Sequence, residues 1–276
     1  MYESSYLKVD EAHERAEKFL DENEIRLETF AGLYDKDLLA RDANEVRRLE
    51  GTFEQSPSKI HADILEAIVC EQGELSNWFG PESQVIKTSR FDDYIHKIDM
   101  IVETKQDGQG VSRFSHLALG IDVTFGSKDL HRKFDAIRAN IDSGVLGEVR
   151  YFHSDRQHFT GCLRKVPQIV VGIAIERVKE LGLLWMNRKS KELSEHGAQV
   201  TILEEAALQL NAFAEYAKKS GGKEAANVVP ILEKELQKIQ ELLTEKKKAG
   251  LVGLKDDKVF EEIKRNLLSF TKESGH

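Results

Sequence analysis

The spacing of apolar residues divides this chain into parts with different periods. Residues Val9 to Leu20 and Leu38 to Leu49 are charged and only sparsely apolar, which predicts two surface helices. A third helix is predicted to begin after Ser56, a capping residue followed by proline, because apolar residues then recur at helical spacing from Ile60 to Val69. Gly73 and Gly80-Pro81 are expected to end this helix.

The middle of the chain contains short β-branched runs bounded by Gly, Pro, Asp or Ser, which predicts strands. The predicted strands are Val85 to Ser89, Lys97 to Glu103, Ser115 to Thr124, Val149 to His153 and Gln168 to Ile175. A glycine-rich hairpin loop is expected at 107–110, and a crossover helix capped by Ser127 is expected to extend to about Ile141. The third and last strands are apolar on both faces, as central strands of a covered sheet are.

From about Glu176 onward the apolar residues are spaced for helices throughout. Leu232, Leu236, Ile239 and Leu243 form a two-heptad seam, which suits an antiparallel helical hairpin or a short dimer contact. The predicted fold is therefore α/β, with a mixed central β-sheet of about five strands flanked by helices and an all-helical C-terminal region. We expect an acidic helical segment over 1–55, an α/β core over 56–175 and the helical region over 176–276.

Composition supports a soluble globular protein, with 40% apolar and 32% charged residues. No apolar run reaches the roughly 18 residues that a membrane span requires, and the acidic N-terminus does not resemble a signal peptide. Cys70 and Cys162 match no metal-ligand spacing and are expected to be reduced thiols, so a cytoplasmic location is predicted.

The net charge of −8 is distributed unevenly. Residues 84–190 hold 13 acidic and 17 basic residues, whereas the segments on either side are acidic overall. A surface that binds phosphate needs such a local positive field, although ordinary variation among solvated faces explains it equally well.

Two aspartates stand inside apolar strands, Asp99 and Asp122, 23 residues apart. A carboxylate buried in a strand costs several kcal/mol unless a charged group meets it. If the two strands are neighbours, the aspartates can share one divalent cation, because Mg²⁺ prefers oxygen ligands. The pair Asp92 and Asp93, just upstream, is expected to cap a turn instead.

The order of the acidic residues along the chain resembles that of the PD-(D/E)XK, or restriction-endonuclease-like, nuclease superfamily. A helix with a glutamate comes first, followed by Asp99 in a hairpin strand, Asp122 near the end of the next strand, and a crossover helix. The resemblance covers about residues 56–175. It implies a mixed sheet flanked by helices and a site that uses Mg²⁺ or Mn²⁺ to hydrolyse phosphodiester bonds in nucleic acid.

By this resemblance Asp99 and Asp122 are metal-binding carboxylates, and the backbone carbonyl of Val123 is a further ligand. Glu66 is the first choice for the glutamate on the preceding helix, and Glu71 is the second. Both glutamates fall within the helix predicted from Ser56.

The chain departs from the family pattern at Thr124, which stands where the motif places its lysine. That lysine would orient the attacking water or stabilise charge at phosphorus, which an uncharged hydroxyl cannot do. Lys128, in the first turn of the crossover helix, is the first candidate to replace it, and Lys133 and Lys165 are the alternatives. A site that uses metal alone and an inactive fold also remain open.

The leading prediction is thus a Mg²⁺-dependent nuclease, with nucleic acid as its partner and no membrane association. The alternative is a catalytically inactive module with the same fold that binds nucleic acid or protein. In either case the C-terminal helices could provide a homodimer or protein contact. No phosphate-binding glycine loop, nucleophile elbow or zinc spacing supports another chemistry.

Overall fold

The computed structural model describes residues 2–52, 56–106, 113–122, 128–220 and 222–272. The three N-terminal helices are α1 (Tyr2–Asn23), α2 (Lys36–Glu50) and α3 (Pro57–Leu75), with a short 3₁₀ turn at Leu27–Phe30. All three were expected from the sequence.

Helix α3 begins as predicted, because the Ser56 hydroxyl accepts a hydrogen bond from the amide of Lys59 at 3.2 Å. The helix continues past Gly73 and ends at Leu75, before Gly80-Pro81. A Cβ atom at Gly73 would lie 2.2 Å from a methyl group of Val85. Gly73 therefore lets α3 approach β1 closely and does not end the helix.

The central sheet is mixed, with the strand order β1-β2-β3-β6. Its strands are β1 (Ser83–Lys87), β2 (Met100–Gln106), β3 (Arg113–Asp122) and β6 (Gln168–Gly172). Strand β2 pairs antiparallel with both β1 and β3, and β3 pairs with β6 in parallel. The connection from β3 to β6 includes the predicted crossover helix, α4 (Lys128–Asp142). The expected hairpin loop at 107–110 and the cap at Ser127 lie outside the described residues.

The two strands between α4 and β6 form a separate sheet. Strand β4 (Gly147–Ser154) was predicted, but β5 (Phe159–Val166) was missed. The sequence signal of β5 is weak because half of its side chains are exposed, and they include two consecutive basic residues. Val149 and Phe152 of β4 pack in one apolar cluster with Ile101 of β2 and Ala118 of β3. The small sheet therefore covers one face of the central sheet, which explains why the central strands are apolar on both sides.

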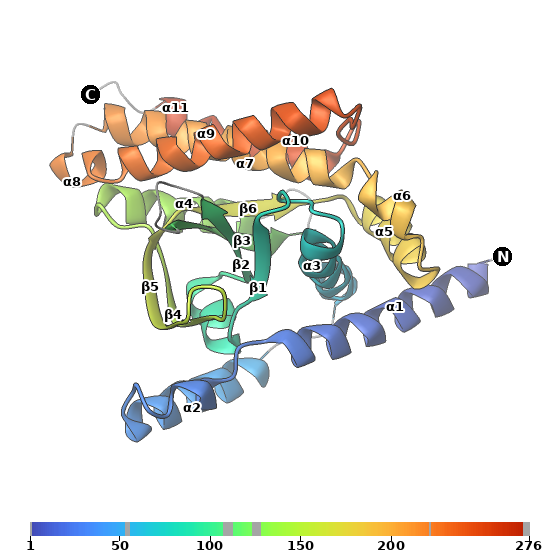
Figure 1. Ribbon diagram of the computed structural model, residues 1–276, viewed down its shortest axis with the longest axis horizontal. Helices are drawn as coiled ribbons and strands as arrows, with labels where there is room; N and C mark the ends of the chain where they lie inside the picture. Colours follow the sequence, from blue (N-terminus) through green and yellow to red (C-terminus); the bar gives the residue numbers. More distant parts are fainter. Residues whose placement is uncertain (1, 53–55, 107–112, 123–127, 221, 273–276) are drawn as a thin grey trace.

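The rest of the chain, where described, is helical as predicted. Its helices are α5 (Ile175–Met186), α6 (Ser190–Ser194), α7 (Ala198–Lys219), α8 (Lys223–Ala226), α9 (Val229–Lys248), α10 (Lys258–Leu267) and α11 (Ser269–Lys272). Figure 1 shows α7, α9 and α10 side by side along one flank of the sheet, with α1 and α2 on the opposite flank. None of the described helices has the length and apolar character to cross a membrane.

Helix α7 docks directly on strand β6. The side-chain amide of Gln209 accepts a hydrogen bond from the backbone N–H of Val170 at 2.8 Å and donates one to its carbonyl at 2.7 Å. The Gln209 amide thus pairs with the backbone N–H and carbonyl of Val170 at the open edge of β6, as the backbone of a further strand would. The C-terminal helical region thus packs against the sheet. Leu232 and Ile239 of the α9 seam are buried in the same apolar core as the sheet, so the seam serves the chain's own fold.

Candidate active site

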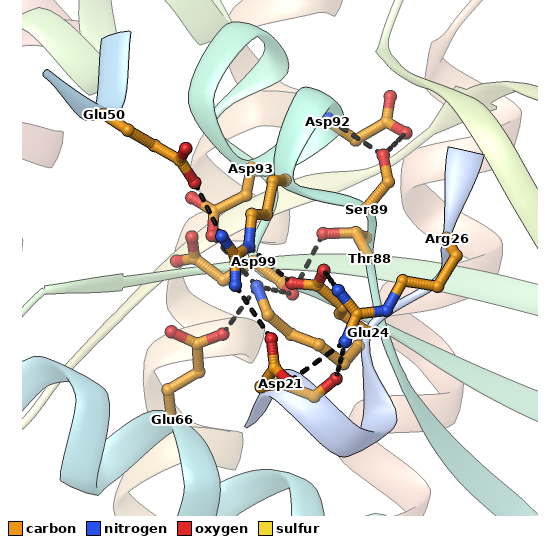
Figure 2. Close-up of polar contacts among 12 residues, drawn as sticks. Asp21, Glu24, Arg26, Glu50, Glu66, Thr88, Ser89, Asp92, Asp93 and Asp99 are labelled. Carbon is orange, nitrogen blue, oxygen red and sulfur yellow. Dashed lines mark hydrogen bonds and ion pairs between the residues drawn. The ribbon is translucent and has the colours of Figure 1, made fainter. Parts of the chain in front are cut away.

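A buried lysine stands at the centre of the acidic residues beside the sheet. Lys87, the last residue of β1, is only 4% exposed. Its ammonium nitrogen lies 2.8 Å from Oε1 of Glu66 on α3 and 2.9 Å from Oδ2 of Asp93. Asp93 belongs to a short π-helical segment, η2 (Asp92–His96), that follows β1. Figure 2 shows Glu66 and Asp93 approaching this centre from different elements.

Asp99, directly before β2, completes the cluster. Its backbone carbonyl accepts hydrogen bonds from the amide and hydroxyl of Thr88, at 3.2 and 3.0 Å, and from the Lys87 ammonium at 3.2 Å. Its amide donates to the carbonyl of Leu119 in β3 at 2.9 Å. The backbone of Asp99 is thus fixed from both neighbouring strands, which holds its side chain in a defined position. We call Glu66, Lys87, Asp93 and Asp99 the buried cluster.

The backbone before Asp99 is unusual at two positions. Lys97 is in the left-handed region, with φ of 57°. A Cβ atom at Gly120 would lie 3.0 Å from the carbonyl oxygen of Lys97, so a side chain there would push the two backbones apart, and glycine favours this close approach of β3. The turn that presents Asp99 therefore depends on a glycine in the neighbouring strand.

The buried cluster holds more negative than positive groups, and the pKa values reflect it. Burial raises the pKa of Glu66 to about 7, although the charge of Lys87 opposes the shift. Burial and the nearby charges of Asp93 and Glu66 raise the pKa of Asp99 well above its usual range. Burial disfavours the charged form of Lys87 and acts to lower its pKa. The surrounding carboxylates outweigh this effect, so the pKa of Lys87 is raised. Lys87 is therefore a permanent cation in this cluster.

Asp93 behaves differently from its neighbours. Burial disfavours its ionisation, but the charge of Lys87 and a hydrogen bond with the Asp99 carboxyl group outweigh this effect and lower its pKa. Asp99 is then the protonated donor and Asp93 the ionised acceptor. Two carboxyl groups that share one proton in this way indicate a deficit of positive charge at the site.

The cluster opens on a cavity of about 1230 Å³. Asp93 and Asp99 lie in its wall, together with four basic residues, Lys59, Lys97, Arg132 and Lys133. The charge of Lys133, on α4, is close enough to Asp99 to oppose the rise in its pKa. Carboxylates and cations thus share one cavity, which is the arrangement that a phosphate ester and its counter-ion require.

The structure places only part of the predicted site. Asp99 directly precedes β2 and Asp122 is the last residue of β3, and these two strands pair with each other. The side chains of Asp122 and Lys128 lie outside the described part of the structure, as do Val123 and Thr124 entirely. Their predicted roles therefore stay predictions.

The two candidate glutamates on α3 have different partners in the structure. Glu66 joins the buried cluster. Glu71 accepts hydrogen bonds from Arg15 at 3.2 Å and from the indole of Trp185 at 2.5 Å, so it holds α1 and α5 against α3. Of the two alternative lysines, Lys133 lines the cavity, whereas Lys165 is an exposed residue of β5 that does not.

Sequence reasoning missed Lys87 and misassigned Asp93. Lys87 ends an apolar strand, and a strand-end lysine is usually solvated, so its burial carried no signal. Asp92, by contrast, has the structural role that was expected of the pair. It is fully buried and accepts hydrogen bonds from the amides of Arg150 and Tyr151, at 2.7 and 3.0 Å. The adjacent Asp93 points to the cluster instead.

A second ionic network lies three residues beyond Lys87. Arg90 contacts Asp21 and Glu24 at 2.9 and 2.8 Å, and Glu50 of α2 at 2.7 Å. Arg26 shares the first two of these carboxylates. We call Asp21, Glu24, Arg26, Glu50 and Arg90 the surface network (Figure 2). The side chain of Arg90 is 39% exposed, so water reaches this network.

The donor set suits a hydrated Mg²⁺ or Mn²⁺ ion. Within the described residues, no three His, Cys, Asp or Glu side chains are grouped as a complete metal site. Mg²⁺ does not need one, because it usually keeps several waters and takes one or two carboxylates plus phosphate oxygens. Asp93 and Asp99 supply two carboxyl groups at the cavity, and these are the side chains that could hold such an ion.

Comparison with protein-family models, with curated proteins and with solved structures gives no match to this chain.

Proposed function

We propose that this protein is a nuclease that hydrolyses phosphodiester bonds in nucleic acid with Mg²⁺ or Mn²⁺. One observation carries the proposal. Asp93 and Asp99, part of a buried cluster with an excess of carboxyl groups, line a cavity that also contains Lys59, Arg132 and Lys133. The divalent ion, when bound, would polarise the scissile phosphate and lower the pKa of an attacking water.

Asp99 and Asp93 are the residues that would hold the ion, with Asp122 as a further predicted ligand. Lys87 acts as a positioning residue. Its ammonium has three N–H donors, and three oxygens already lie within 3.2 Å, on Glu66, Asp93 and Asp99. No donor remains for a phosphate, so charge at phosphorus must be stabilised by another cation. Lys133 and Arg132, which line the cavity from α4, are placed for that role.

The order of elements is what supports the proposed PD-(D/E)XK relationship. An acid on the helix before the sheet, an acid at the start of β2 and an acid at the end of β3 precede a crossover helix, as the resemblance requires. This remains an argument from fold and order, so the chemistry rests on the site itself.

A catalytically inactive binding module is the second candidate. The observation in its favour is that Lys87 already neutralises part of the charge of Glu66 and Asp93, as a purely structural ion pair would. Such a module would use the basic cavity to bind nucleic acid, or the C-terminal helices to contact protein, without cleavage.

A cleavage assay separates the two candidates. The full chain is incubated with labelled DNA and RNA, single- and double-stranded, in Mg²⁺, in Mn²⁺ and in excess chelator. We expect cleavage that needs the metal and falls about a hundredfold or more in Asp99→Asn and Asp122→Asn. Asp21→Asn, which removes a carboxylate from the surface network, is the matched control and should cut like the wild type. No cleavage of any substrate would favour the binding module.

A further inference from the structure

The wall of the cavity changes character along one face of α4. Arg132 and Lys133 line it near the start of the helix, Ala136 and Ile137 follow one turn later, and Asn140 follows after another turn. Residues at this spacing share one helix face, and seven residues of helix span roughly 10 Å. The basic end lies beside Asp99, because Lys133 acts electrostatically on that carboxyl group. The apolar and amide end lies farther along the helix.

Two apolar side chains that line the cavity are left in contact with solvent. Ile95 and Val145 both line the cavity, and they are 38% and 45% exposed. Tyr94 and His96 add two aromatic rings to the lining. Exposed apolar groups inside a basic cavity favour a ligand that is itself partly flat and apolar.

Amide groups complete this part of the lining. Gln168, at the start of β6, and Asn140 both contribute to it. The Gln168 side chain donates to the carbonyl of Lys97 at 2.9 Å. The side-chain amide of Asn140 has no hydrogen-bond partner within the described ranges. Amide side chains offer both a donor and an acceptor, which is what the edges of nucleic acid bases bind.

We propose that the cavity receives one unpaired nucleotide, with its phosphate at the basic end beside Asp99 and its base against Ile95, Val145 and Asn140. The substrate is then single-stranded nucleic acid or an unpaired segment. This inference rests on the proposed function for its scissile phosphate, but the binding it describes is independent of cleavage.

Charge argues for a single strand over a duplex. Affinity for duplex DNA comes largely from many phosphate contacts, each made by a basic residue. This chain has a net charge of −8, and its cavity groups only four basic residues. Unpaired nucleic acid is bound differently, by stacking of splayed bases on aromatic or apolar side chains, with phosphate contacts in support.

The test is binding of short labelled oligonucleotides to the full chain in excess chelator, measured by fluorescence anisotropy. DNA and RNA single strands are compared with duplexes of the same sequence. We expect at least one single strand to bind about tenfold or more tightly than its duplex. Val145→Asp should weaken that binding about tenfold, because it places a charge where the base packs. Asn140→Ala should weaken it severalfold.

Val252→Asp is the matched control. Val252 is 68% exposed and does not line the cavity, and its substitution changes net charge by the same amount. It should bind like the wild type. Equal affinity for duplex and single strand, or wild-type binding by both Val145→Asp and Asn140→Ala, would overturn the inference. Selective binding without metal-dependent cleavage would support the cavity's ligand while contradicting the nuclease proposal.

Discussion

Lys87 and Arg90 stand three residues apart, and each meets carboxylates from distant parts of the chain, yet their surroundings differ. Lys87 is 4% exposed and meets Glu66 and Asp93 beside a cavity. Arg90 is 39% exposed and joins the N-terminal segment to Glu50 of α2. Figure 2 shows the two groups next to each other.

The difference lies in water and in charge balance. In the surface network two arginines meet three carboxylates, and solvent screens what remains. In the buried cluster one lysine meets three acidic residues, and burial raises the pKa values of Glu66 and Asp99. Similar residues therefore form a structural clamp in one place and the proposed cation site in the other. Burial and charge balance together distinguish the two groups.

The largest contrast is expected in stability. Lys87→Met leaves the carboxylates of the buried cluster without their cation, and we expect it to lower the free energy of unfolding by about 3–5 kcal/mol. Arg90→Met removes three solvent-screened ion-pair contacts and should cost about 1 kcal/mol. Urea denaturation of both variants measures the difference. Equal losses would show that the two networks do not differ as described.

A second contrast concerns the lysine that the motif lacks. If the protein cuts nucleic acid, Lys128→Ala or Lys133→Ala should lower kcat about a hundredfold, with metal binding unchanged. Lys128 remains the first choice from its position at the start of α4, and Lys133 is the one that the structure places in the cavity. Lys165→Ala, exposed on β5, is the control. Single-turnover rates at saturating Mg²⁺ provide the measurement. Wild-type rates in both α4 variants would refute a lysine on this helix.

The last contrast is a dependence of stability on pH. The pKa of Glu66 is raised to about 7 in the folded protein, so its folded form binds a proton more tightly than the unfolded chain does. Its contribution to stability is fully present below the unfolded pKa, near 4.5, and is lost as the pH rises through about 7. Glu66→Gln removes the ionisable group, so the variant does not lose this stability as the pH rises. Relative to the wild type, the variant should therefore become more stable as the pH increases from about 5 to about 8, by up to about 1.4 kcal/mol per unit of pKa shift. Urea denaturation in chelator across this range would show it, and a difference that stays constant with pH would contradict it.

The framework of the fold follows from the sequence because its signals are local. The cap at Ser56 and the apolar spacing after it predict α3, and the β-branched runs predict four strands of the central sheet and β4. The sequence did not show β5, whose exposed positions include Thr160, Arg164 and Lys165. It also did not show that β4 leaves the central sheet to cover it, because that depends on contacts between distant residues such as Phe152 and Ala118.

The site was less accessible to sequence reasoning. Asp99 could be selected because it interrupts an apolar strand, and Glu66 because it lies on the helix before the sheet. Lys87 and Asp93 could not, since their roles come from burial and from the turn that follows β1. The contrast between Lys87 and Arg90 has no counterpart in the sequence, where both are basic residues near the end of one strand.

The most direct test of this account is Mn²⁺ binding to the full chain, measured by titration calorimetry without nucleic acid. The account predicts that the wild type binds Mn²⁺ at the buried cluster, that Asp99→Asn loses this binding and that Asp21→Asn, in the surface network, retains it. Absence of binding by the wild type, or binding by Asp99→Asn as tight as that of the wild type, would contradict the claim that the buried cluster is a metal site.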